Sequence, residues 1–157
     1  MNDNPKLEKL NSLLKSERAD YSIFTHEVTF KSAAEGAKHF GISLGQTTPT
    51  LILKSKDRCF AAIICGDTRI SFKKLKEALN LQDISMADPQ TVLHMTGANV
   101  GEISLINTGM TTLIDQSVLK NTDCYGGCGV PRATLRINTH DLVRITKAQI
   151  LDFTESR

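Results

Sequence analysis

The sequence predicts an α+β domain with a mixed or antiparallel sheet. The expected strands come in adjacent runs between short helices, without the regular strand–helix alternation of a doubly wound fold. The segment 59–65 carries apolar side chains on both faces, which is typical of a central strand that is covered on both sides. The chain has 157 residues, about one domain's worth at ~100–200 residues per domain. We therefore expect a single domain over residues 1–157.

Composition and charge exclude several classes of protein. The 19 Lys and Arg residues nearly balance the 17 Asp and Glu residues, and a formal charge of +2 is too weak to indicate nucleic-acid binding by itself. No apolar run approaches the ~20 residues of a membrane-spanning helix, and the first residues do not resemble a signal peptide. With no secretory signal, the four cysteines are expected to be reduced thiols. We therefore expect a cytoplasmic protein without membrane contact.

Capping residues mark the expected helices. Asn4 is a typical N-cap and Pro5 a typical first helical residue, and the leucine spacing that follows predicts a helix over about 5–18. Ser32 and Glu35 form a capping-box pattern, which predicts a short helix that ends at Gly41. Further helices are expected after Ser71, from Asp88-Pro89 to Gly97, and, as a polar helix, near the C-terminus.

Runs of β-branched and other apolar residues mark the expected strands. Polar connections at 54–58 and 66–69 separate some of them. The segment 97–110 shows no sustained period, and a loop of that length in a compact domain is more often functional than idle. The expected strands cover 21–28, 50–53, 59–65, 84–86, 111–114, 123–125 and 134–137.

Cysteine and histidine spacing gives little support for a metal site. Cys124 and Cys128 form one close pair, whereas a structural zinc site needs four ligands. The pair is interpreted as small apolar residues in a turn, with thiol chemistry as the alternative. The four histidines lack metal-ligand spacing, and no phosphate-binding loop, dinucleotide fingerprint or nucleophile elbow is present. We expect no metal and no cofactor.

Two glycine-rich segments are the remaining candidates for chemistry: the loop 97–109 and the turn 126–129. Successive backbone N–H groups in such segments can form concavities that bind an anion or an oxyanion. The alternative is that these glycines serve turns alone. The residues by themselves leave both interpretations open.

Several short motifs run along the chain in a distinctive order, over roughly residues 20–146. This order and spacing resembles the YbaK family, which is also the editing domain associated with prolyl-tRNA synthetase. The motifs are Thr25-His26-Glu27, Pro49-Thr50-Leu51-Ile52-Leu53, Gly66-Asp67-Thr68-Arg69, Lys73-Lys74-Leu75, Ala87-Asp88-Pro89, Thr96-Gly97 and Gly126-Gly127-Cys128-Gly129.

The resemblance implies a barrel-like, largely antiparallel β structure flanked by short helices. It also implies hydrolysis of the ester that joins a wrong amino acid to tRNA, with catalysis by backbone donors and the tRNA's own hydroxyl. Gly101 matches the first glycine of the family's Gly-x-x-x-Pro loop and is the candidate catalytic residue. The implied substrate-binding residues are His26, Thr50, Gly97, Asn99, Ser104, Gly127 and Gly129.

Two positions depart from the family pattern. The family's pocket lysine aligns with Pro49, which has no amino group and no N–H. Lys54 is a poor replacement, because an odd offset of five residues along a strand places it on the opposite face. The lost charge-assisted contact could cost ~1.5–3 kcal/mol, one to two decades in binding or rate. The family's loop proline aligns with Leu105, which predicts a less rigid loop.

The leading hypothesis is a freestanding aminoacyl-tRNA deacylase that edits mischarged tRNA in trans and so supports translation fidelity. Its expected partners are the acceptor end of aminoacyl-tRNA and an aminoacyl-tRNA synthetase, with no DNA. The alternative is a non-catalytic binding module of the same fold, in which Pro49 marks lost chemistry. Such a module would recognise an aminoacyl-adenosine-like group or a protein partner.

Overall fold

Ten short strands, counted over the described residues 4–157, form the frame of the molecule in this computed structural model. Residues 1–3 of the predicted single domain lie outside the described part. The strands are β1 (Tyr21–Thr25), β2 (Thr50–Ser55), β3 (Arg58–Ile63), β4 (Thr68–Ile70), β5 (Ser85–Met86), β6 (Thr111–Asp115), β7 (Asp123–Gly127), β8 (Ala133–Asn138), β9 (Gln149–Leu151) and β10 (Thr154–Ser156).

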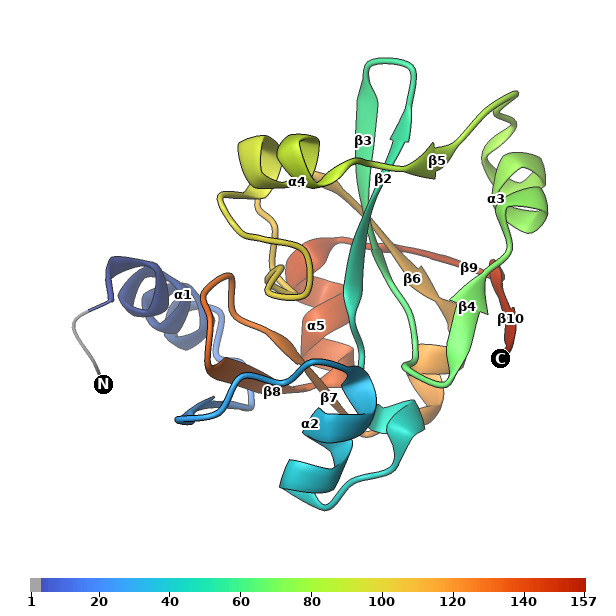
Figure 1. The fold of residues 1–157 in the computed structure, drawn as a ribbon. Helices are drawn as coiled ribbons and strands as arrows, with labels where there is room; N and C mark the ends of the chain where they lie inside the picture. The colour runs from blue at the N-terminus through green and yellow to red at the C-terminus, as the bar shows by residue number, and fades with distance from the viewer. Residues whose placement is uncertain (1–3) are drawn as a thin grey trace.

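The strands pair into three sheets, with the orders β5-β2-β3-β6-β9, β1-β8-β7 and β10-β4 (Figure 1). The pairs β3–β6 and β6–β9 are parallel, and the other pairs between described strands are antiparallel. The predicted α+β class with a mixed, largely antiparallel sheet is therefore confirmed. Hydrogen bonds do not close the described strands into one barrel. Two isolated bridges, Thr47↔Tyr125 and Ser104↔Gly127, link β7 to neighbouring loops instead.

Helices begin and end at capping residues that the sequence marks. The Ser32 hydroxyl accepts from the Glu35 amide, and the Glu35 carboxylate accepts from the Lys31 amide. The first helix ends at Ser16, two residues before the predicted end, and Arg18 then adopts a left-handed φ of 54°. No helix in the described part of the chain is long and apolar enough to cross a membrane. The helices are α1 (Pro5–Ser16), α2 (Ala33–Phe40), α3 (Phe72–Leu79), α4 (Pro89–Thr96) and α5 (Thr139–Thr146), with short 3₁₀ turns η1 (Leu44–Gln46) and η2 (Gln116–Lys120).

Several strand boundaries differ from the sequence prediction. The strand predicted over 21–28 ends at Thr25. The predicted connection 54–58 is mostly strand, because β2 and β3 continue to a two-residue turn in which Lys56 adopts a φ of 56°. The predicted turn 66–69 contains the start of β4, which pairs with β10 near the C-terminus. β9 and β10 were not predicted at all, since such three-residue strands depend on partners far away in the sequence.

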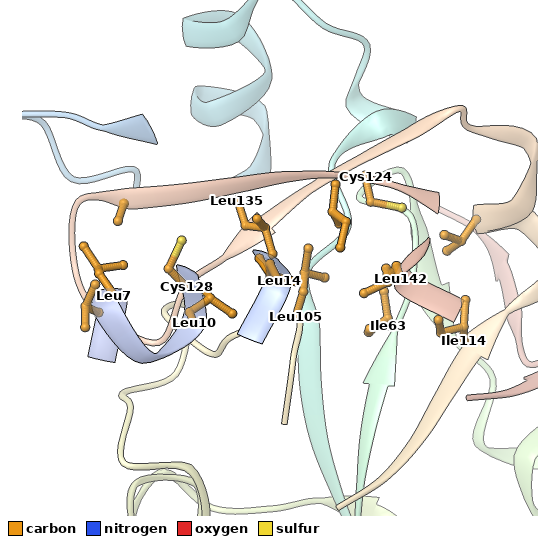
Figure 2. Packing of buried hydrophobic residues seen from close by; sticks show 14 of the residues in the cluster. Leu7, Leu10, Leu14, Ile63, Leu105, Ile114, Cys124, Cys128, Leu135 and Leu142 are labelled. Atoms are coloured by element: carbon orange, nitrogen blue, oxygen red, sulfur yellow. The ribbon is translucent and has the colours of Figure 1, made fainter. Parts of the chain in front are cut away.

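The core surrounds β3, as its two apolar faces predict. Phe60 and Ala62 belong to one buried cluster, whereas Ile63 belongs to another that α1 covers. Figure 2 shows this second cluster, in which the leucines of α1 lie alongside residues of β8 and of the segment after β7. At ~25 cal/mol per Å² of buried apolar surface, such packing is the main stabilising contribution to the fold.

A buried carboxylate joins the C-terminal strands to the main sheet. Asp115, only 1% exposed, accepts hydrogen bonds from the Phe153 amide (2.8 Å) and the Thr154 hydroxyl (2.9 Å). The Ser117 amide (3.0 Å) and hydroxyl also donate to it. Burial raises the pKa of Asp115, but these hydrogen bonds outweigh burial and hold the pKa below its ordinary value. Asp115 therefore stabilises the folded state as a carboxylate.

We expect Asp115→Asn to lower the free energy of unfolding by about 2–3 kcal/mol at pH 7, because an amide cannot accept all four hydrogen bonds. In the unmodified protein this stabilisation is complete above the unfolded pKa of about 3.9 and is lost as pH falls through the lower folded-state pKa. Urea unfolding between pH 7 and pH 3 measures both effects. The control is Asp152→Asn, which removes an exposed ion pair with Lys74 and should change stability little. Equal stability of Asp115→Asn and the unmodified protein would contradict this role.

Candidate functional site

A pocket of about 230 Å³ lies between the N-terminal end of α2, the segment before β2, and the β7–β8 hairpin. Its walls come from the segments 29–33, 47–49, 101–102, 125–127 and 132–134, together with His26, Val130 and parts of α2. In Figure 1 the irregular segment after α4, drawn in yellow, runs back toward β7 and β8. Segments far apart in the sequence therefore meet at this pocket.

His26 is held in the pocket wall by both of its ring nitrogens. Its backbone N–H donates to the Arg132 carbonyl at 3.0 Å, which continues the β1–β8 pairing by one bond. Nδ1 lies 2.7 Å from the Val28 carbonyl oxygen, which can only accept, so Nδ1 carries a proton. Nε2 lies 3.1 Å from the Thr134 hydroxyl. With both nitrogens engaged, His26 is positioned as a wall residue and has no free nitrogen to act as a base.

Aromatic rings extend the wall around His26. Phe30 stacks on the His26 ring with centroids 4.4 Å apart, and Phe40 packs edge-on to Phe30 at 6.0 Å. Phe40 also contacts the Tyr125 ring at 5.7 Å. Ring faces of this kind provide stacking surfaces for unpaired nucleobases. This wall therefore offers aromatic rings on which a planar ligand group can stack.

Another part of the pocket wall rests on a close contact between the loop 101–105 and β7. A Cβ on Gly127 would overlap the Ile103 carbonyl oxygen, and a Cβ on Gly126 would come within 2.6 Å of the Leu105 side chain. The Leu105 amide donates to the Gly127 carbonyl at 3.1 Å, and the Gly129 amide donates to the Glu102 carbonyl at 2.9 Å. Glycine is needed at positions 126 and 127, because side chains there would keep the loop 101–105 away from β7.

The backbone at Gly101 leaves an unused donor in the pocket wall. Gly101 has a φ of 92°, a conformation that L side chains rarely adopt, while a Cβ there would meet no atom within 4 Å. Within residues 4–157, the Gly101 amide donates no hydrogen bond, although the next amide, that of Glu102, donates to the Asn99 carbonyl. An exposed N–H that lines a pocket can stabilise a negatively charged oxygen of a ligand.

The residues implied by the resemblance separate into three groups. His26, Gly101 and Gly127 line the pocket. Gly97, Asn99 and Gly129 line a neighbouring hollow, where Lys6 Nζ donates to the Gly97 carbonyl at 2.5 Å. Glu102 borders both hollows.

The other two implied residues, Thr50 and Ser104, line neither hollow. Thr50 is buried, and its hydroxyl is the one buried side-chain oxygen in the described part that lacks a hydrogen-bond partner. The Ser104 hydroxyl accepts from the Ile106 amide at 3.0 Å. Ser104 reaches the site through its backbone bridge to Gly127.

The two residues that depart from the family pattern, Pro49 and Leu105, lie in different parts of the structure. Pro49 lines the pocket, and Lys54 does not. Leu105 stands at the position of the family's loop proline, and the loop was expected to be less rigid without that proline. Leu105 is fully buried in the core cluster beneath α1, so apolar packing anchors the loop. Lys31 and Arg132 also line the pocket and were missed by sequence reasoning, because nothing in their local sequence sets them apart from other surface cations.

The cysteines take no part in the pocket. Cys124 and Cys128 are buried free thiols, and burial raises their pKa values to about 11 and about 12. Thiols so far from ionisation at neutral pH are poor nucleophiles, which argues against the thiol alternative. Across the described residues, no three His, Cys, Asp or Glu side chains are grouped so that they could hold a metal ion.

Comparison with known proteins gives a consistent set of relatives. A family model described as an aminoacyl-tRNA editing domain matches residues 27–145. A proline–tRNA ligase of Acidithiobacillus ferrooxidans is 32% identical over 73 residues, which cover 46% of this chain but only 13% of the ligase. The Multifunctional Ser/Thr-tRNA deacylase ProXp-y of Escherichia coli is 25% identical over 153 residues, which cover 93% of this chain and 91% of that protein.

The fold also matches solved structures. One described as a candidate trans-editing enzyme for prolyl tRNA synthetase has a TM-score of 0.86 at 20% identity. The superposition covers 99% of this chain and 100% of the other chain. This likeness supports the architecture described above.

We expect Gly127→Ala to lower the free energy of unfolding by about 3 kcal/mol and to push the 101–105 loop away from β7, because the new methyl group collides with backbone that cannot move freely. Gly36→Ala is the matched control, since it adds a methyl group elsewhere in the lining of the same pocket, at an ordinary 3.5 Å from Phe30. Within α2 that change should be neutral or slightly stabilising. Chemical denaturation of both variants measures the difference, and similar stabilities would contradict the close contact.

Proposed function

Because the chain belongs to the aminoacyl-tRNA editing domain family, we propose that it hydrolyses the ester between a wrongly attached amino acid and tRNA. It acts in trans, as a single editing domain in the cytoplasm, on tRNA that a separate synthetase has charged. A relative of similar length whose name describes a tRNA deacylase supports this form of the proposal. The chain spans only a small part of the proline–tRNA ligases that it matches.

The observation that carries the proposal is the unused Gly101 amide in the wall of a small pocket. Ester hydrolysis begins when a water oxygen attacks the carbonyl carbon, and the carbonyl oxygen then becomes an oxyanion. We expect the Gly101 N–H to donate to that oxyanion, a contact worth about 2.7–4 kcal/mol where it has been measured in another hydrolase. The carbon–oxygen bond to the ribose then breaks, the ribose oxygen takes up a proton, and the amino acid leaves as its carboxylate.

His26 has a supporting role in this scheme. Its two nitrogens are committed to Val28 and Thr134, so it shapes the pocket and presents its ring beside Phe30. The proton relay then falls to the tRNA's own hydroxyl, which the family resemblance implies. In this scheme the reaction needs a fixed backbone donor and a positioned substrate more than a nucleophilic side chain.

Substrate choice follows from the size of the pocket. About 230 Å³ must accept the aminoacyl group beside the aromatic wall, which favours small amino acids. Pocket size discriminates by only ~1–3 kcal/mol per methylene group, so several small amino acids should be accepted. We also propose that a synthetase supplies part of the affinity for tRNA, because a net charge of +2 offers little general attraction.

We expect the protein to deacylate tRNAs mischarged with small amino acids faster than the spontaneous rate. Gly101→Ala should reduce this rate by 10-fold or more, because alanine disfavours a φ of 92° and the amide shifts. Gly109→Ala is the matched control: Gly109 has a φ of 85°, no atom within 4 Å of a new Cβ, and no part in the pocket. Both variants should lose similar stability. If no mischarged tRNA is hydrolysed, the enzymatic proposal fails, and equal rates in the two variants would remove Gly101 from it.

Pro49→Lys tests the alternative of a binding module with lost chemistry. We expect less than a 3-fold change in deacylation, because Lys31 and Arg132 already bring positive charge to the pocket that Pro49 lines. The rate constant is measured on the same mischarged tRNA, with thermal unfolding as the control for folding. A gain of 10-fold or more from a near-zero native rate would favour the binding module over a working deacylase.

A further inference from the structure

Two cations line the pocket, and their side chains have no partner among the described residues. Lys31 precedes the N-cap of α2, and Arg132 lies in the turn between β7 and β8. Both side chains are exposed, and neither makes an ion pair or a side-chain hydrogen bond with any described residue. Among the other surface cations, Arg136 and Arg144 each bridge two carboxylates. Lys31 and Arg132 therefore bring two unpaired charges to the place where a ligand would enter.

Arg132 also holds a strained backbone conformation. Its φ of 58° lies in the left-handed region, which is unfavourable for a residue with a Cβ. Its carbonyl accepts the His26 amide, so the same turn that places the guanidinium also fixes the wall of the pocket. Strained residues persist when the surrounding structure holds them, and they cluster at functional sites. Arg18 shares this conformation outside the pocket, so it is the position of Arg132 in the pocket wall that makes it a candidate for ligand binding.

The charges of an aminoacyl-tRNA decide which part of it would meet these cations. Its amino group is positive and would be repelled, and its carboxyl is esterified and carries no charge. The negative groups are the phosphates of the RNA backbone. A guanidinium matches a phosphate with two parallel hydrogen bonds, and an ammonium adds a point charge. Pro49, at the position of the family's lysine, offers no such contact.

Resting on the proposed function, we propose that Arg132, with help from Lys31, forms a phosphate-binding subsite for the RNA strand whose 3′ end enters the pocket. The subsite draws its cations from the β7–β8 turn and from the segment before α2, at the entrance to a pocket in which Pro49 supplies no charge. Glu102 is the one carboxylate among the described lining residues, and it forms no ion pair with either cation.

The test is binding of an uncharged RNA hairpin with a single-stranded 3′ end, which requires no catalysis. We expect Arg132→Gln to weaken binding ~10-fold and Lys31→Gln to weaken it less. Each substitution should make the decline of log affinity with log salt concentration less steep by about 0.7–0.9, which is the effect of losing one phosphate contact. Arg132→Lys, which keeps the charge, should retain most of the affinity.

Arg18→Gln is the matched control for Arg132→Gln. Arg18 is also exposed, has a φ of 54° and makes no ion pair with the described residues, but it lies outside the pocket. It should change RNA affinity less than 2-fold. Equal effects of the two substitutions, or an unchanged salt slope for Arg132→Gln, would overturn the subsite.

A kinetic measurement separates this inference from the proposed function. The preference of the enzyme for a mischarged tRNA over a phosphate-free aminoacyl-adenosine ester should fall ~10-fold in Arg132→Gln. If the unmodified protein hydrolyses both esters and the preference stays the same, the phosphate subsite is wrong and the deacylase stands. If it hydrolyses neither but binds the RNA through Arg132, the deacylase is wrong and the subsite stands.

Discussion

The contact between the 101–105 loop and β7 is the constraint on which the pocket depends. Gly126 and Gly127 have no side chains, so the loop can lie directly on the strand. The amides of Leu105 and Gly129 then hydrogen-bond across this contact. These bonds hold the loop against β7, and the amide of the pocket-lining Gly101 donates no hydrogen bond to the described residues. The donor on which we base catalysis thus lies in a loop that backbone packing holds in place.

A site built from main chain tolerates side-chain changes that would disable a site built from catalytic side chains. Leu105 stands where the resemblance implies proline, yet its complete burial anchors the loop through the core that α1 covers (Figure 2). Pro49 removes an ammonium without altering the amides that form the pocket wall. What the site must retain is the position of its donor within a fraction of an ångström, and apolar packing can supply that position.

Local charge matters more for this protein than total charge. A net charge of +2 suggests little affinity for RNA, but the pocket gathers two unpaired cations and a single carboxylate among its described lining residues. Exposed cations without partners keep their full charge for a ligand, and their attraction is strongest within about a Debye length of ~8–10 Å. The pocket can therefore attract an anionic polymer although the net charge of the chain is only +2.

The sequence by itself determined the local elements, because caps and apolar periodicity act over a few residues. Asn4, Ser32 and Asp88 begin helices where they were expected, and the two apolar faces of 59–65 placed β3 at the centre of the sheet. Tertiary structure alone decided β4, β9 and β10, whose pairing depends on partners distant in sequence. It also decided which cations reach the pocket. The Arg132 carbonyl accepts the His26 amide, and so brings Arg132 beside the pocket wall, only because β1 pairs with β8. The spacing of residues along the chain indicates which face of a helix or strand each side chain occupies. Which distant segments come into contact is decided by tertiary packing.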